Sequence, residues 1–284
     1  LGPMWTIGEV RVTEIAELTT TSAAHWLLPD ATADRIREIE WMVPHYATPE
    51  GKVHMTIRAL VVESEGRRIL VDTCLGNDKE RPVESWSMRS GPFLDDLSAA
   101  GYPPESIDTV LCTHLHVDHV GWNTRLVDGE WVPTFPNARY LFAEVEWEHW
   151  QREDSGMDQV LRADSIQPVI DAGLVDLVAT DARLTSHLSL TPTPGHTPGH
   201  VSVLIESGDG RAVITGDVSH MVCQATHPEW GSSFDVDPDG AEATRRAFFE
   251  GRADTDELVL GTHWEPCAGY VKSHGDVWRV EPAG

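Results

Sequence analysis

The sequence predicts an α/β fold in which a mixed sheet carries helices on both outer faces. Short apolar runs typical of strands alternate with longer amphipathic segments typical of helices. Neither a low-complexity linker nor an internal repeat interrupts this alternation. The 284 residues are 40% hydrophobic and include 11 tryptophans, which is enough to bury a core. A helix bundle or a barrel fits this order less well.

The first half of the chain contains the plainest strand patterns. Residues 9–15 alternate polar and apolar side chains, and two further strands flank the turn Ser64-Glu65-Gly66 and predict a hairpin. A short amphipathic helix over residues 93–100 ends before Gly101. The predicted strands of this half are residues 9–15, 55–63, 68–73 and 107–113.

The second half repeats the alternation. Residues 144–172 are predicted to be mostly helical, and residues 239–250 form a further amphipathic helix. The predicted strands are residues 188–193, 201–206, 212–215 and 257–261. We expect one domain over residues 4–284, with residues 1–3 as a scar of an expression tag ahead of Met4.

Residues 20–54 depart from the alternation. They place apolar side chains such as Trp26, Leu28 and Trp41 among polar ones. We expect this segment to form a lid or the contact of a homodimer, and the alternative is a surface excursion packed on the core.

Charge and cysteine usage exclude several classes of function. The chain has 21 basic and 46 acidic residues, a net charge of −25, which disfavours nucleic-acid and membrane partners and favours a small molecule that is not strongly anionic. Its four cysteines lack C-x-x-C spacing and are too few for a disulfide framework, so we expect them to be reduced thiols. Without a signal peptide or a long apolar run, the protein is expected to be cytoplasmic.

The stretch THLHVDHVGW holds the densest cluster of ligand-type side chains. His114, His116, Asp118 and His119 follow a predicted strand, so they are expected on a loop at its carboxyl end. Alternate residues of an extended segment point the same way, which lets His114 and His116 bind one ion. Imidazole and carboxylate are ligands of zinc and similar ions, so the cluster predicts a metal site.

Three more candidate ligands also follow predicted strands. His196 lies in the turn TPTPGHTPGH, Asp217 follows the strand AVITG, and His263 follows LVLGT. The full set predicts two divalent ions, Zn²⁺ first and Mn²⁺, Fe²⁺ or Co²⁺ as alternatives. One ion is assigned three histidines, the second is assigned Asp118 with two histidines, and Asp217 bridges both. The predicted metal ligands are His114, His116, Asp118, His119, His196, Asp217 and His263.

This pattern resembles the metallo-β-lactamase superfamily, which carries H-x-H-x-D-H followed by a histidine, an aspartate and a histidine. The resemblance covers the chain from about Ile7 onward and implies an αβ/βα sandwich of two mixed sheets flanked by helices. It also implies that Asp72 orients a ligand histidine. The family usually has glycine where this chain has Cys74, and we expect that difference to have no chemical consequence.

Differences within the superfamily narrow the expected activity. Common zinc β-lactamases have cysteine where Asp217 stands. Glyoxalase II shares the ligands, but this chain offers only Lys272 and Arg279 near its end for binding glutathione. The turn at residues 194–200 resembles N-acyl-homoserine-lactone lactonases and methyl parathion hydrolase-like enzymes. The lactonases usually have tyrosine where this chain has His220.

The ligand set predicts a dinuclear hydrolase that uses a metal-bridging hydroxide on a small neutral ester or lactone. The predicted catalytic residues are Asp118, which passes a proton to the leaving group, and His220, which stabilises developing charge. The alternative for His220 is a loop histidine without substrate contact. Apolar residues near the ligands line an acyl pocket or belong to the core: Trp122, Met221 and Trp264. Alternative functions are an organophosphate triesterase, a glyoxalase II-like thioesterase and a non-catalytic binding protein.

Overall fold

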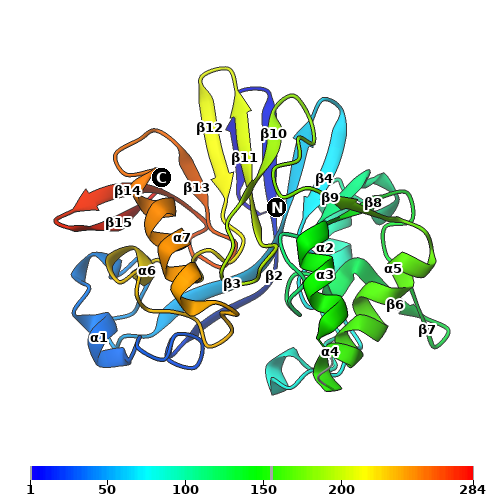
Figure 1. Ribbon diagram of the computed structural model, residues 1–284, viewed down its shortest axis with the longest axis horizontal. Coiled ribbons are helices and arrows are strands. Elements are labelled where there is room, and N and C mark those ends of the chain that lie inside the picture. Colours follow the sequence, from blue (N-terminus) through cyan, green and yellow to red (C-terminus); the bar gives the residue numbers. More distant parts are fainter. Residues whose placement is uncertain (1, 154–155, 284) are drawn as a thin grey trace. The chain divides into compact units, whose positions relative to one another are not determined.

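The computed structural model describes residues 2–153 and 156–283 and divides into two compact units (Figure 1). Unit 1 comprises Leu1–Glu17, Ile57–Thr180 and Thr185–His187, and unit 2 comprises Leu18–Thr56, Asp181–Leu184 and Leu188–Gly284. Among the described residues, no helix has both the length and the apolar character needed to cross a membrane.

Most strands of unit 1 belong to a mixed seven-stranded sheet with the order β1-β2-β3-β4-β5-β8-β9. Its strands are β1 (Met4–Ile7), β2 (Val10–Ser22), β3 (Val53–Ser64), β4 (Arg67–Val71), β5 (Thr109–Leu111), β8 (Arg139–Ala143) and β9 (Val175–Val178). β3 and β4 are antiparallel, which confirms the predicted hairpin. β4, β5, β8 and β9 run parallel, so their carboxyl ends share one edge of the sheet.

Unit 1 also contains α-helices and shorter helical turns between its strands. They are α2 (Phe93–Ala99), α3 (Glu144–Arg152), α4 (Gly156–Leu161) and α5 (Gln167–Asp171), with a π-helical turn η5 (Arg162–Ile166) and the short 3₁₀ turns η2 (Glu84–Trp86), η3 (Pro104–Ser106) and η4 (Gly121–Asn123). The predicted helix at residues 93–100 and the mostly helical stretch at residues 144–172 are confirmed, except that residues 154 and 155 lie outside the described residues. A separate hairpin of β6 (Thr124–Val127) and β7 (Glu130–Pro133) was not predicted.

Unit 2 contains a mixed six-stranded sheet with the order β10-β11-β12-β13-β14-β15. Its strands are β10 (Leu188–Pro192), β11 (Val201–Ser207), β12 (Gly210–Ile214), β13 (Leu258–Leu260), β14 (Ala268–His274) and β15 (Val277–Pro282). Only β12 and β13 are parallel. The predicted mixed α/β class with two sheets is therefore confirmed.

Helix α7 (Pro238–Glu250) packs on the core of unit 2. Its buried residues, Ala241, Arg245, Phe248 and Phe249, lie on one helical face. Phe249 stacks on Trp264 and Trp278, with ring centroids 6.4 and 6.0 Å away. Asp237 caps the first turn by accepting from the Gly240 amide. The short helix α6 (Cys223–Thr226) belongs to the same unit.

Residues 20–54 contribute to the core of unit 2. The segment contains the short helix α1 (Ala33–Arg37) and the 3₁₀ turn η1 (Glu40–Met42). Leu28, Met42 and Tyr46 are fully buried in the same apolar cluster as residues of α7. This packing matches the alternative of an excursion on the core, and a lid or dimer role remains a prediction.

Candidate metal centre

The motif at residues 113–122 follows β5 in unit 1. His114 and His119 are buried, whereas His116 and Asp118 are partly exposed. The His114 Nε2 atom lies 3.1 Å from His116 Nδ1, and His119 Nε2 lies 3.6 Å from an oxygen of Asp118. We call these four residues the unit 1 cluster. Their donor atoms converge as the sequence predicts.

Asp72 anchors the unit 1 cluster from the end of β4. Its Oδ2 atom lies 2.8 Å from His119 Nδ1, which leaves Nε2 of that ring facing Asp118. The same carboxylate accepts from the amide and the hydroxyl of Thr113 at 2.8 and 2.9 Å. The predicted contact between Asp72 and a histidine of the motif is therefore present, and it is of the kind that fixes the orientation of an imidazole ring.

The loop after Asp72 fixes the backbone of the motif. The Thr73 amide donates to the His119 carbonyl at 2.8 Å, and the Gly121 amide donates to the Cys74 carbonyl at 2.7 Å. A Cβ atom on Gly121 would lie 1.9 Å from the Leu75 carbonyl carbon, so this close approach requires glycine. Cys74 has φ +54°, in the left-handed region that favours glycine, which explains why glycine suits this position.

Glu146, at the start of α3, was not predicted and also supports the motif. Its buried carboxylate accepts from the Leu115 amide at 3.0 Å and from Trp150 Nε1 at 2.8 Å. The Trp150 ring packs edge-on against His116, with centroids 5.6 Å apart. Glu146 therefore holds both the motif backbone and an aromatic neighbour of a predicted ligand.

Unit 2 brings three histidines to one carboxylate. Asp217 follows β12, and its oxygens lie 3.4, 3.1 and 3.1 Å from the Nε2 atoms of His196, His220 and His263 respectively. All four side chains are buried. We call them the unit 2 cluster. The structure thus joins residues that follow β10, β12 and β13, as predicted, and adds His220.

The second ring nitrogen of two of these histidines is anchored. His196 Nδ1 lies 2.7 Å from Asp235 Oδ1, and His263 Nδ1 lies 3.2 Å from the Thr56 carbonyl oxygen. Neither partner was predicted. The fragment SFDVDPDG offers three aspartates as candidates for a partner of His196, and nothing in their pattern distinguishes them: Asp235, Asp237 and Asp239.

His200 positions the backbone beside Asp217. Its Nε2 atom accepts from the Asp217 amide at 2.7 Å, while Nδ1 lies 2.8 Å from the Thr193 hydroxyl. Both ring nitrogens of His200 are therefore engaged within the turn beside Asp217.

His220 has a distinct environment. Its backbone amide donates to Gln224 Oε1 at 2.8 Å, which fixes the loop that carries the ring. The ring lies parallel to that of His263, with centroids 6.0 Å apart. Nδ1 is buried and has no hydrogen-bond partner among the described residues. The structure therefore places His220 beside a predicted ligand.

The carboxylates of unit 2 create a setting that favours positive charge. Burial lowers the pKa of His196, but hydrogen bonds to Asp217 and Asp235 outweigh it and raise that pKa to about 9. The pKa of His220 is lowered, chiefly by burial, although Asp217 opposes the shift. The cluster thus favours a cation while keeping the His220 ring neutral.

The three predicted pocket residues pack in apolar cores. Met221 and Trp264 belong to the buried cluster of unit 2. Trp122 stacks on Phe93 at 5.7 Å in unit 1 and donates from Nε1 to Glu17 at 2.7 Å. Their burial supports the alternative, that they are core residues.

The donor set fits divalent metal ions. In His119, His196 and His263, one ring nitrogen contacts an oxygen acceptor while the other faces a carboxylate. Metal-ligating histidines are held in this way, because the anchored nitrogen fixes the tautomer and the ring orientation. Neutral imidazole and carboxylate donors suit Zn²⁺, Mn²⁺, Fe²⁺ and Co²⁺.

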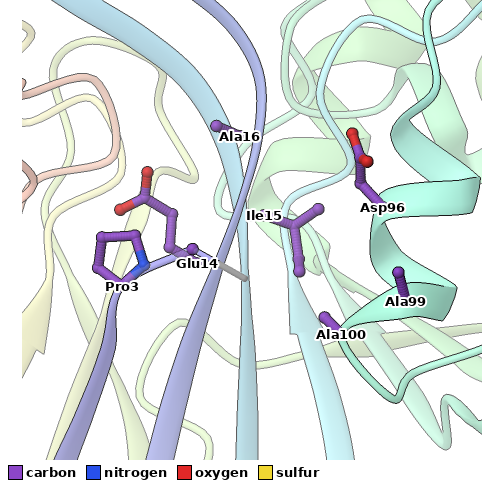
Figure 2. A pocket seen from close by; sticks show the side chains of 8 residues that line it. Pro3, Glu14, Ile15, Ala16, Asp96, Ala99 and Ala100 are labelled. Carbon is purple, nitrogen blue, oxygen red and sulfur yellow. The ribbon is translucent and has the colours of Figure 1, made fainter.

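A hollow in unit 1 offers no comparable chemistry. Figure 2 shows Glu14 and Asp96 on its wall, together with Pro3 and small apolar side chains. Its volume is about 280 Å³. The lining contains no histidine and none of the predicted site residues.

The chain is similar in sequence to two N-acyl homoserine lactonases. An N-acyl homoserine lactonase from a Bacillus species is 26% identical over 189 residues, which cover 61% of this chain and 68% of the lactonase. A second N-acyl homoserine lactonase, from Bacillus cereus, is 25% identical with the same coverage.

Solved structures show the same fold. AidC, a dizinc quorum-quenching lactonase, superposes with a TM-score of 0.79 at 23% identity, and the match covers 99% of this chain and 97% of AidC. The hydrolase AbOPH gives the same TM-score and coverage at 24% identity. The family model of the metallo-β-lactamase superfamily matches residues 56–263, a range that contains every predicted ligand. Because this match spans well over half of the sequence, the chain belongs to the metallo-β-lactamase superfamily.

Proposed function

We propose that the protein is a dinuclear metal-dependent hydrolase of small neutral lactones and esters. The observation that carries the proposal is the shared arrangement of three predicted ligands, His119, His196 and His263, each anchored on one nitrogen and facing a carboxylate with the other. The family match supports it because the matched range includes both clusters.

The ligands divide into two sets. In this proposal the first ion would be held by His114, His116, His196 and Asp217, and the second by Asp118, His119 and His263, with Asp217 shared between them as the sequence predicts. Two divalent ions held by these residues would supply Lewis acidity and a water whose pKa lies near 7.

Two residues of the chain act on the substrate in this proposal. The Asp118 carboxylate passes a proton to the leaving oxygen, for which its partial exposure gives access. His220 donates from a ring nitrogen to the oxygen on which negative charge develops. A neutral imidazole held beside Asp217 suits that role.

Two observations support a neutral lactone or ester over other substrates. The net charge of −25 disfavours polyanions such as nucleotides. Arg245, near the unit 2 cluster, lies 3.3 Å from Asp235, so its positive charge is already paired with a carboxylate within the protein. The similarity to two N-acyl homoserine lactonases, although their sequence identity to this chain is low, also supports a lactone as the substrate.

Metal-loaded protein tests the proposal against a panel of homoserine lactones, aryl esters, a phosphotriester and a glutathione thioester. We expect turnover of lactones or aryl esters that disappears on chelation and in the His116→Ala variant. The matched control is His187→Ala, because this histidine lies 3.4 Å from the exposed Glu9 and is not one of the predicted site residues. That variant should keep parental turnover.

Two results would contradict the proposed substrate class or the activity itself. Metal-dependent turnover confined to the phosphotriester or to the thioester would replace the substrate class. No metal-dependent turnover of any compound by protein that binds two ions would favour a non-catalytic binding protein.

A further inference from the structure

Asp235 occupies a central position behind the unit 2 cluster. It lies in the loop between α6 and α7, and its side chain is fully buried. One carboxylate oxygen lies 2.7 Å from His196 Nδ1, and the other accepts from the Ser232 amide at 2.9 Å. The carboxylate therefore joins a predicted ligand to its own loop.

Arg245 extends this connection to the second predicted ligand of unit 2. It projects from α7 and is buried, with Nη2 3.3 Å from Asp235 Oδ2. Its Nε atom donates to the Val218 carbonyl at 3.1 Å, and Nη1 donates to the Pro228 carbonyl at 2.6 Å. Val218 directly follows Asp217, so one guanidinium joins Asp235, the partner of His196, to the loop of Asp217.

Backbone contacts hold the His196 turn in the same arrangement. The Val236 amide donates to the His196 carbonyl at 3.0 Å, and the Asp237 amide donates to the Gly195 carbonyl at 2.9 Å. A Cβ atom on Gly195 would lie 2.3 Å from the Ala241 nitrogen, so the turn sits directly on the first turn of α7. The ring of His196 thus depends on the Asp235 loop for its placement.

We infer that Asp235 and Arg245 are positioning residues of the metal centre. Asp235 fixes the tautomer and orientation of the His196 ring, and Arg245 keeps the spacing between the His196 and Asp217 loops. The inference rests on the proposed function because it assumes that these two ligands bind a metal ion. Partners of ligating histidines typically change metal affinity by about 10- to 100-fold when they are replaced.

The test is the metal affinity of the Asp235→Asn variant of the full chain. An asparagine oxygen can still accept from His196 Nδ1, but it lacks the negative charge that raises the ligand's basicity and pairs with Arg245. Competition with a chromogenic chelator should show that one of the two zinc ions binds about 10- to 100-fold more weakly. The visible spectrum of the Co²⁺-loaded variant should also change.

Asp237→Asn is the matched control. It makes the same chemical change two residues away, and asparagine caps a helix as well as aspartate does, so zinc affinity should stay parental. A weakened ion in both variants would assign the effect to the loop as a whole and overturn the inference.

Arg245→Lys keeps the test decisive if Asp235→Asn does not fold. Lysine retains the charge but not the fork that reaches Val218 and Asp235 together, so we expect weaker binding of one zinc ion. Parental zinc affinity in a folded Asp235→Asn or Arg245→Lys protein would overturn the inference. Parent protein that binds two ions but hydrolyses nothing would contradict the proposed function alone.

Discussion

The two clusters differ in how the chain builds them. The unit 1 cluster comes from six consecutive positions on one loop after β5, and its anchor Asp72 follows the neighbouring strand β4. The unit 2 cluster collects residues from three loops that lie far apart in the sequence. A single tight turn can position the unit 1 cluster, whereas the loops of the unit 2 cluster need contacts from other elements to hold them in place.

The contacts that hold the two clusters in place reflect this difference. In unit 1, the anchoring carboxylate of Asp72 is held by Thr113, one residue before the first ligand. In unit 2, Asp235 is held by Arg245 from α7, and the Asp217 amide is held by His200 from the preceding loop. Local sequence therefore specifies the first cluster, and tertiary packing specifies the second.

The largest expected effect is the loss of bound metal when Asp217, the proposed bridging ligand, is replaced, compared with the loss when a ligand of one ion is replaced. Asp217 contacts three histidines, so Asp217→Ala should reduce bound metal from close to two ions to less than one per chain. His116→Ala removes a ligand of one ion only and should leave about one. Metal analysis after loading and gel filtration measures both. Equal metal content in the two variants would remove the special role of Asp217.

A smaller effect is expected for His220, which distinguishes a substrate contact from a ligand in unit 2. His220→Ala should lower turnover about 100-fold, the usual loss when one donor to a developing oxyanion is removed. Its metal content should stay parental. If turnover is unchanged, His220 is a loop histidine, and if metal is lost, it is a ligand.

The smallest effect is expected for Cys74 in unit 1. Cys74→Gly removes a left-handed penalty of about 1–2 kcal/mol, but it also removes a buried side chain and adds flexibility to the unfolded chain. We expect the free energy of unfolding, measured in urea, to change by less than about 1 kcal/mol, with metal content unchanged. A loss above about 2 kcal/mol would show that the thiol contributes to the turn.

How far the sequence predicts the molecule follows the same division between local and tertiary information. The hairpin of β3 and β4 and helix α2 have strong local patterns and signals at their ends. The pair β14 and β15 was missed, because Lys272, Ser273 and Trp278 give it no clean alternation. The formation of this strand pair depends on the packing of one of its faces against the core of unit 2.

The site shows this division more sharply. The predicted ligands follow strands and have metal-binding side chains, so residue type and position identify them. Asp235 and the Thr56 carbonyl contact predicted ligands, and Glu146 holds the Leu115 backbone beside them, all through contacts between residues distant in sequence. An aspartate among other acidic residues, or any backbone carbonyl, carries no mark of that role.

We propose that the seven predicted ligands hold two divalent ions, with Asp217 shared between them. The most direct test is metal analysis of Mn²⁺- or Co²⁺-loaded protein combined with electron paramagnetic resonance. We predict close to two ions per chain and spin coupling between them, because the ions share a bridge. One ion or fewer after loading, or two ions without spin coupling, would contradict the claim.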